Sequence, residues 1–325
     1  MNELIKIEGL HLDLLGPPGG TRGRILRGID LSMMEGEKLA LVGESGCGKS
    51  MIALSILNLI PRPPMVQSGG RILFKGEGLD GFNEDQWRDL RGKRIGIVFQ
   101  EPLSSLNPVL TVGDQLVEGL IAHHQAGPEE ARTKALGLLR EVGLPDPDRI
   151  FGHYPHQLSG GMCQRVMIAM AVSCKPELLI ADEPTTALDV TVQAQILDLL
   201  AQMTRVHRMA VLLITHDLRI ARDFSDRVAI LYCGKVVEMG PAKVLFERPA
   251  HPYTQGLLDA IPKVDKTGEE LGWIPGTLPS PYDSLTGCAF AERCPRADER
   301  CRKTEPGWIE VEKGHSALCF YPSKG

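Results

Sequence analysis

The chain has 325 residues, of which 43% are hydrophobic and 24% are charged, and its formal net charge is −5. This composition is ordinary for a water-soluble globular protein, and the length allows two domains or one large domain with an extension. A net negative charge, without a basic run that includes aromatic residues, gives no reason to expect a nucleic-acid partner. The first residues lack the pattern of a secretory signal, and no apolar run is long enough to span a membrane. We therefore expect a cytosolic chain that reaches a membrane only through partners.

Two stretches at the start of the chain have the partial alternation of β-strands. They cover residues 4–15 and 24–33, and the glycines and prolines of residues 16–20 predict a turn between them. This pattern predicts a β-hairpin. A third apolar stretch at residues 38–42 predicts a short buried strand.

A glycine-rich loop follows this third strand. Its sequence is Gly43-Glu44-Ser45-Gly46-Cys47-Gly48-Lys49-Ser50. This fits the phosphate-loop pattern, in which a glycine is followed by any four residues and then by Gly-Lys-Ser or Gly-Lys-Thr. An apolar helix is expected from residue 51. The glycines let backbone N–H groups face inward, and the helix N-terminus adds partial positive charge. We expect Lys49 to reach the β- and γ-phosphates of a nucleoside triphosphate and the Ser50 hydroxyl to ligate Mg²⁺. Cys47 has no catalytic task there, and its alkylation is expected to block the nucleotide by steric bulk.

The middle of the chain changes from strand to helix and back. Strands are expected at residues 71–74 and 94–99, and helical periodicity follows at residues 111–123, 128–142 and 161–172. Apolar runs typical of strands return at residues 177–181 and 210–215, and a hairpin is expected around Gly234. Prolines and glycines in residues 271–287 predict a loop. We predict an α/β nucleotide-binding core with a helical insertion of about seventy residues.

Two carboxylates follow the apolar strand at residues 178–181. A buried strand with an exposed acidic end would place Asp182 beside Mg²⁺ and Glu183 where it can activate water as a general base. The alternative is a strand that simply ends in solvated acidic residues.

A second anion-binding pattern precedes the helix expected at residues 161–172. Ser159 is predicted to cap this helix, and Gly160 and Gly161 would expose backbone N–H groups at its positive end, although a plain capped helix is the alternative.

This stretch, Ser159-Gly160-Gly161, resembles the signature of ABC-transporter ATPase subunits. Further residues follow in the order of that family. Gln100 resembles the Q-loop glutamine, Ala187-Leu188-Asp189 the D-loop, and His216 the switch histidine that contacts the γ-phosphate.

The resemblance covers about residues 4–240 and implies a P-loop NTPase fold with an antiparallel β subdomain, a helical insertion and a small C-terminal extension. We expect residues 1–100 and 175–245 to form the core, residues 101–174 the signature subdomain, and residues 246–325 the extension. In this family two chains pack head to tail with ATP and Mg²⁺ between them. The resemblance implies that one chain supplies the phosphate loop, the Mg²⁺ ligands Ser50, Gln100 and Asp182, the base Glu183, and His216. The other chain supplies its Ser159-Gly160-Gly161.

Two further stretches resemble one branch of the family. Residues 99–108 are similar to the extended Q-loop of oligopeptide and dipeptide importers, and residues 251–258 are similar to their C-terminal His-Pro-Tyr motif. In that motif we expect a structural role for His251 and a helix cap at Thr254.

This branch implies import of peptides, with nickel or glutathione as alternatives. The implied partners are two transmembrane permease subunits, a second similar or identical ATPase and an external solute-binding protein. The resemblance implies that the chain is a peripheral subunit at the cytoplasmic face of the cell membrane. A soluble ABC ATPase of DNA repair or translation, and a regulatory half that does not hydrolyse ATP, are the rival functions.

The eight cysteines are unevenly distributed, since Cys288, Cys294, Cys301 and Cys319 crowd into the last 38 residues. Four thiolates in a tail that is expected to be poor in strands can bind a metal, although the paired knuckles of structural zinc are absent. Disulfides conflict with a cytosolic chain. The resemblance to dipeptide-importer subunits with a similar tail implies a [4Fe–4S] cluster. Zinc and a reduced tail without metal remain the alternatives.

Overall fold

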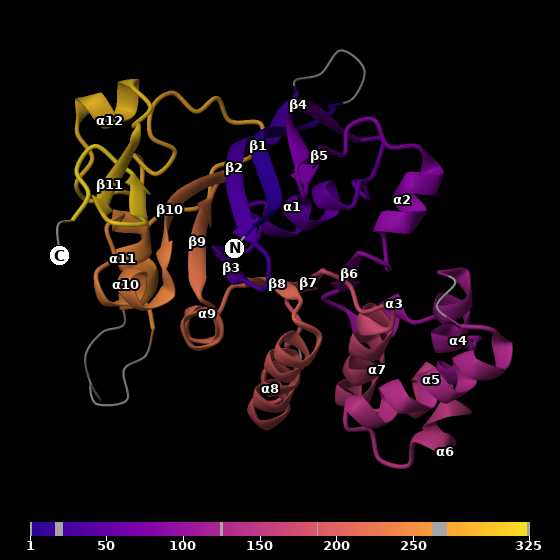
Figure 1. Cartoon of the computed structure of the whole chain (residues 1–325). Coiled ribbons are helices and arrows are strands. Elements are labelled where there is room, and N and C mark those ends of the chain that lie inside the picture. Colours follow the sequence, from indigo (N-terminus) through magenta and orange to yellow (C-terminus); the bar gives the residue numbers. More distant parts are fainter. Residues whose placement is uncertain (1, 17–21, 124–125, 187, 262–271, 324–325) are drawn as a thin grey trace. The chain divides into compact units, whose positions relative to one another are not determined.

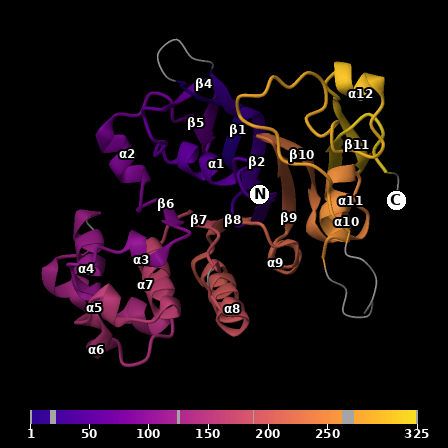
Figure 2. The same cartoon turned by 180° about the vertical axis from the view of Figure 1, so that it is seen from behind.

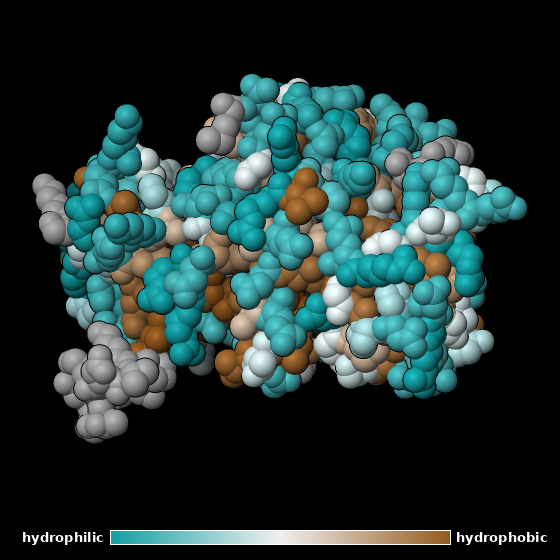
Figure 3. Space-filling model, turned by 60° about the horizontal axis from the view of Figure 1, so that its bottom comes forward, coloured by the Kyte–Doolittle hydropathy of each residue, from teal (hydrophilic) through white to brown (hydrophobic). Residues whose placement is uncertain are grey.

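The computed structural model describes residues 2–16, 22–123, 126–186, 188–261 and 272–323, which form two compact units. Unit 1 comprises residues 1–33, 38–80 and 215–325, and unit 2 comprises residues 34–37 and 81–214. Figures 1 and 2 show the helices and strands of both units from opposite sides. On the face seen in Figure 3, hydrophilic side chains predominate and hydrophobic ones are visible between them.

Unit 1 begins with an antiparallel sheet in the order β2-β1-β4-β5. Its strands are β1 (Glu3–Leu14), β2 (Gly23–Met34), β4 (Met65–Phe74) and β5 (Glu77–Gly78). The adjacency of β1 and β2 confirms the predicted hairpin, and residues 17–20 of its turn lie outside the described residues. β1 also pairs with β4, from Ile5 opposite Phe74 to Leu14 opposite Met65.

Five more strands of unit 1 are consecutive neighbours in the order β11-β12-β10-β9-β3. They are β3 (Lys38–Val42), β9 (Arg227–Tyr232), β10 (Lys235–Pro241), β11 (Trp308–Glu312) and β12 (His315–Leu318). β3 and β9 are parallel, whereas the other pairs are antiparallel. The expectation of a tail poor in strands was therefore wrong, because β12 pairs with β10 and protects an edge that would otherwise be open.

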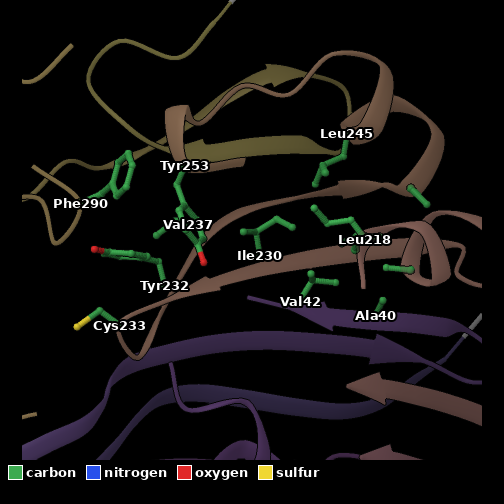
Figure 4. Packing of buried hydrophobic residues seen from close by; sticks show 13 residues of the cluster. Ala40, Val42, Leu218, Ile230, Tyr232, Cys233, Val237, Leu245, Tyr253 and Phe290 are labelled. Carbon is green, nitrogen blue, oxygen red and sulfur yellow. The ribbon is translucent and has the colours of Figure 1, made fainter. Parts of the chain in front are cut away.

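The helices of unit 1 are α1 (Lys49–Ile56), α9 (Leu218–Phe224), α10 (Ala242–Glu247), α11 (Pro252–Asp259) and α12 (Glu299–Lys303). A hydrophobic cluster joins α9, α10 and α11 to β3, β9 and β10 (Figure 4). Within it the ring centroid of Tyr232 lies 4.6 Å from that of Tyr253 and 5.2 Å from that of Phe290. Both tyrosines are fully buried. The C-terminal residues thus share one core with the strands that precede them.

Unit 2 contains three parallel strands in the order β8-β7-β6, namely β6 (Ile95–Val98), β7 (Leu178–Asp182) and β8 (Ala210–Thr215). Every residue of β7 and β8 is buried, which explains their continuous apolar sequences. The helices are α2 (Glu84–Leu90), α3 (Pro102–Ser105), α4 (Val112–Ala122), α5 (Pro128–Glu141), α6 (Pro147–Phe151), α7 (Gly160–Val172) and α8 (Val190–His207), with a 3₁₀ turn at Pro155–Gln157. The three predicted helices correspond to α4, α5 and α7. Within the described ranges, no helix combines the length and the hydrophobicity needed to cross a membrane.

A buried carboxylate in β10 connects three segments of unit 1. Glu238 is inaccessible to solvent and accepts hydrogen bonds from the backbone N–H groups of Ala250, at 2.7 Å, and His251, at 2.8 Å. His315 Nε2 lies 2.7 Å from the same carboxylate. Because these partners come from two different segments, Glu238 connects β10 to both β12 and the start of α11.

His251 itself is the cap of α11. Its Nδ1 accepts the N–H of Tyr253 at 3.1 Å, so the expected cap at Thr254 was wrong, whereas the structural role of His251 is confirmed. Burial lowers the pKa of His251 to about 4, against the opposing effect of Glu238. The imidazole is therefore neutral and keeps the lone pair that caps the helix.

We predict that the protein loses stability as the pH falls from 6.5, the ordinary pKa of histidine, to about 4, the pKa of folded His251. In this range the unfolded chain binds a proton at residue 251 that the folded chain does not, so the free energy of unfolding decreases. Urea denaturation across the range measures the decrease. The control is His251→Asn, which keeps a side-chain acceptor for the cap but does not titrate. Equal pH dependence in the two proteins would contradict the prediction.

Candidate functional site

The phosphate loop connects β3 to α1 as the sequence predicts, and two of its glycines are required by geometry. Gly48 has φ 109°, and a Cβ there would lie 2.9 Å from Leu26 Cδ2. At Gly43 a Cβ would lie 2.2 Å from the carbonyl oxygen of Leu231 in β9. Other residues would clash at both positions. Helix α1 begins at Lys49, two residues earlier than expected.

Lys49 lies under this loop with only 5% of its surface exposed. Its Nζ donates hydrogen bonds to the carbonyl oxygens of Gly43, at 2.8 Å, and Glu44, at 3.0 Å. The loop thus holds a cation next to the N-terminus of α1, where backbone N–H groups carry partial positive charge. This arrangement suits an anion such as a phosphate chain.

Cys47 is buried inside the loop. Its exposed fraction is 2%, and its Sγ lies 4.0 Å from Lys49 Nζ. Burial raises the pKa of the thiol to about 11, although Lys49 acts in the opposite direction. A neutral, enclosed thiol is a poor nucleophile.

His216 is another predicted site residue in unit 1. It is exposed and lies between β8 and α9, directly after Thr215. The Thr215 hydroxyl accepts the N–H of Asp217 at 3.0 Å, and Asp217 caps α9. This turn holds the backbone of His216 while its side chain faces solvent.

The two predicted acidic residues, Asp182 and Glu183, lie in unit 2 with Gln100, which contacts Glu183. Asp182 is the buried last residue of β7, and Glu183 follows with φ 46°, in the left-handed region that non-glycine residues rarely adopt. Gln100 comes two residues after β6, and its Nε2 donates to Glu183 Oε2 at 3.2 Å. The parallel pairing of β6 with β7 brings the two residues to the same edge.

Thr186 is a site residue that the sequence reasoning missed. Its hydroxyl donates to Glu183 Oε2 at 2.9 Å, and its N–H donates to the Glu183 carbonyl at 3.1 Å. The sequence did contain a signal for this contact, because Thr186 is a hydroxyl residue three positions after a carboxylate at the end of a strand, a spacing typical of turns. Together with Gln100, Thr186 fixes the orientation of the carboxylate.

The predicted second anion-binding pattern also lies in unit 2, at the start of α7. The Ser159 hydroxyl accepts the N–H of Met162 at 3.3 Å, which confirms the cap. Ser159 and Gly160 are exposed, whereas a Cβ at Gly161 would lie 2.9 Å from Val192 Cγ1. The positive end of a long helix therefore faces solvent. Of the expected D-loop, Asp189 caps α8, and Ala187 lies outside the described residues.

The four tail cysteines, Cys288, Cys294, Cys301 and Cys319, line one narrow cavity in unit 1. Burial raises the pKa of the Cys288 thiol to about 11, and the other three thiols act in the same direction. Within the described part of the chain, however, no three His, Cys, Asp or Glu side chains are arranged to hold a metal ion. The structure brings the thiols together without forming a metal site.

Known proteins resemble this chain over its length. Residues 26–186 match the family described as ABC transporter, and residues 237–301 match the family described as oligopeptide/dipeptide transporter, C-terminal region. The dipeptide transport ATP-binding protein DppD of Bacillus subtilis (strain 168) is 45% identical, with 98% of this chain and 95% of the relative covered. DppD of Escherichia coli (strain K12) is 44% identical, with 96% of each chain covered. The solved dimeric ATP-binding cassette MJ0796, in a post-hydrolysis state with ADP and Pi, has a TM-score of 0.65 at 30% identity, covering 73% of this chain and 98% of its own.

We predict that Cys47 resists alkylation in the folded protein. A pKa of about 11 in place of 9.0 leaves about a hundredfold less thiolate at neutral pH, and burial slows the reaction further. Iodoacetamide labelling of native and urea-unfolded protein, followed by peptide mass spectrometry, compares the same thiol in both states. Equal labelling rates would contradict the structure. The expected block of ATP binding by alkylation applies only to molecules in which the loop has opened.

Proposed function

The chain belongs to the ABC transporter ATPase family, and we propose that it is the ATP-hydrolysing subunit of an importer for dipeptides or oligopeptides. Similarity to DppD over 98% of the chain carries this proposal. The match of residues 237–301 to an oligopeptide/dipeptide transporter region favours it over a soluble ABC ATPase. Similarity to dipeptide transport subunits over nearly the whole chain favours it over nickel or glutathione import. The intact group around Glu183 favours it over a half that does not hydrolyse ATP.

In this proposal the phosphate loop binds ATP. Lys49 would exchange its two carbonyl partners, those of Gly43 and Glu44, for phosphate oxygens, and α1 would add its positive end. Ser50, Gln100 and Asp182 provide a hydroxyl, an amide oxygen and a carboxylate, which are the oxygen ligands that Mg²⁺ prefers. When bound, Mg²⁺ would neutralise charge on the phosphates.

Glu183 is proposed as the general base that accepts a proton from the attacking water. Its carboxylate already has two donors, Gln100 and Thr186, so its orientation is fixed before substrate binds. The left-handed backbone at Glu183 has an energetic cost of about 1–3 kcal/mol, which is typical of residues held in place for a function. His216 is proposed to contact the γ-phosphate.

The exposed cap of α7 supports the proposal that two chains share each ATP. Ser159 and Gly160 face solvent and have the anion-binding character of a helix N-terminus. We assign them, with Gly161, to the γ-phosphate held by a second ATPase chain, identical or similar. We further propose the division into a core (1–100 and 175–245), a signature subdomain (101–174) and an extension (246–325).

Exposed apolar side chains near Gln100 support a membrane partner. Phe99, Leu103 and Val109 are 36%, 56% and 75% exposed, respectively, in the segment that links β6 to α4. Exposed apolar side chains close together in sequence are typical of surfaces that bind another protein. We propose that this segment contacts a transmembrane permease subunit at the cytoplasmic side of the membrane. The complete transporter would contain two permease subunits, and an external solute-binding protein would deliver the peptide.

We predict that Glu183→Gln strongly reduces both ATP hydrolysis and peptide uptake. Loss of the base is expected to lower kcat about 10²–10⁴-fold, while ATP still binds because the phosphate loop is unchanged. The measurement is ATP hydrolysis, ATP binding and dipeptide uptake by the complete transporter in vesicles. Glu177→Gln, before the start of β7, is the matched control and is expected to retain activity. Full ATPase activity of a dimeric Glu183→Gln chain would rule out Glu183 as the base.

For the tail we propose that Cys288, Cys294, Cys301 and Cys319 hold a [4Fe–4S] cluster. The shared cavity supports this, since four cysteine thiolates are the usual ligands of such clusters. Zinc held by the same four thiolates is the alternative. A bound cluster would link the loop residues Cys288 and Cys294 to α12, which contains Cys301, and to Cys319, which directly follows β12.

We predict about four iron atoms and matching sulfide in each chain after anaerobic purification, with visible absorption. Cys301→Ser is expected to lose the iron and the colour. Cys174→Ser is the control, because Cys174 is buried elsewhere, in unit 2, and should leave the iron content unchanged. Protein without iron, or with one zinc per chain instead, would contradict the cluster.

A further inference from the structure

Glu44, the second residue of the phosphate loop, is held by the distant C-terminal extension. Its carboxylate forms a two-point ion pair with Arg293, at 2.8 Å from Nη1 and 3.0 Å from Nη2. Its backbone N–H donates to the hydroxyl of Tyr253 at 3.1 Å. Its carbonyl oxygen accepts the hydrogen bond from Lys49. Three parts of one loop residue are thus fixed, two of them by residues 209 and 249 positions away in the sequence.

Arg293 is itself rigidly placed. Its side chain is only 8% exposed, and its Nε donates to the carbonyl of Pro275 at 2.9 Å. Its guanidinium lies 5.7 Å from the ring centroid of Tyr232, whose ring packs against Tyr253 (Figure 4). A guanidinium with several fixed contacts loses little entropy when it binds a carboxylate. Arg293 is therefore a preformed clamp.

A short turn sets the backbone position of Arg293. Its backbone N–H donates a hydrogen bond to the carbonyl of Phe290 at 3.0 Å. Two further backbone hydrogen bonds run from the N–H of Ala291 to the carbonyl of Cys288, at 3.0 Å, and from the N–H of Cys294 to the carbonyl of Ala291, at 3.4 Å. Phe290 belongs to the same aromatic cluster as Tyr232 and Tyr253. The clamp is thus built into the core of unit 1.

The charge of Glu44 explains why such a clamp matters for ATP. A carboxylate in a loop that binds phosphates repels them, because like charges a few ångströms apart interact strongly near a protein surface. The side chain of Glu44 is 27% exposed, so water alone screens it only in part. Arg293 neutralises the carboxylate of Glu44 and holds it against the C-terminal extension.

Resting on the proposed ATP-binding function of the loop, we propose that Arg293 is a positioning residue for ATP binding, through which the C-terminal extension supports the nucleotide site. Arg293 does not touch the nucleotide in this proposal. It acts through Glu44, by removing repulsion and by fixing the loop that carries Lys49. Loss of Arg293 is expected to raise the KM for ATP about 5- to 150-fold, the usual range of coupling between sites, with a smaller change in kcat.

The test compares Arg293→Gln, Glu44→Gln and the double variant by the KM and kcat for ATP of the complete transporter. Arg293→Gln leaves Glu44 unneutralised and should have the highest KM. Adding Glu44→Gln removes the repelling charge, so the double variant should recover most of the lost affinity. A merely structural Arg293 would show no such rescue. Arg302→Gln, which removes an exposed ion pair with Glu292 in the same extension, is the matched control and should leave KM unchanged.

Glu44→Asp covers the case in which Arg293→Gln does not fold. This substitution keeps the negative charge but shortens the side chain by one methylene. The carboxylate then no longer reaches Arg293, so the KM for ATP should also rise. Thermal melting of each variant separates loss of folded protein from loss of affinity. A KM within twofold of wild type in folded Arg293→Gln or Glu44→Asp, or no rescue in the double variant, would overturn the proposal.

Discussion

Parallel strand pairing is the constraint on which the acidic part of the candidate site depends, because it brings the carboxyl ends of β6, β7 and β8 to one edge of the sheet. Gln100 follows β6, Asp182 ends β7 with Glu183 directly after it, and His216 follows β8, while in unit 1 the phosphate loop follows β3. In open α/β sheets, ligands bind at these strand ends, where the chain turns away from the sheet. Fully buried strands such as β7 and β8 make these positions rigid. The chemistry is thus carried by short turns that a packed core holds in place.

Backbone conformation then sets what each turn can do. Gly48 adopts a positive φ to begin α1, and Glu183 adopts one as a non-glycine residue to aim its carboxylate. In the first case glycine removes the steric cost, and in the second the surrounding hydrogen bonds from Gln100 and Thr186 offset it. The positive charge of the buried Lys49 is likewise satisfied by its surroundings, since it donates hydrogen bonds to two loop carbonyls.

The C-terminal extension is joined to the nucleotide-binding part of unit 1 by aromatic packing and buried charge. Tyr232, Tyr253 and Phe290 form one cluster, and Glu238 ties β10 to both α11 and β12. This gives a physical reason for the His-Pro-Tyr stretch. His251 caps α11, Pro252 begins the helix, and Tyr253 reaches the phosphate loop through its hydroxyl. The extension therefore supports the loop as well as carrying the cysteines.

The sequence by itself determined the family, the motifs and most of the local elements. It predicted β3 and β8 to the residue and α4, α5 and α7 to within one residue at either end, because periodicity and caps are local properties. Contacts between distant segments were decided only by the tertiary structure. These include the Glu44–Arg293 pair, the burial of Cys47, the pairing of β12 with β10, and the choice of His251 over Thr254 as cap. No local pattern predicts them, because each depends on which surfaces meet when the chain packs.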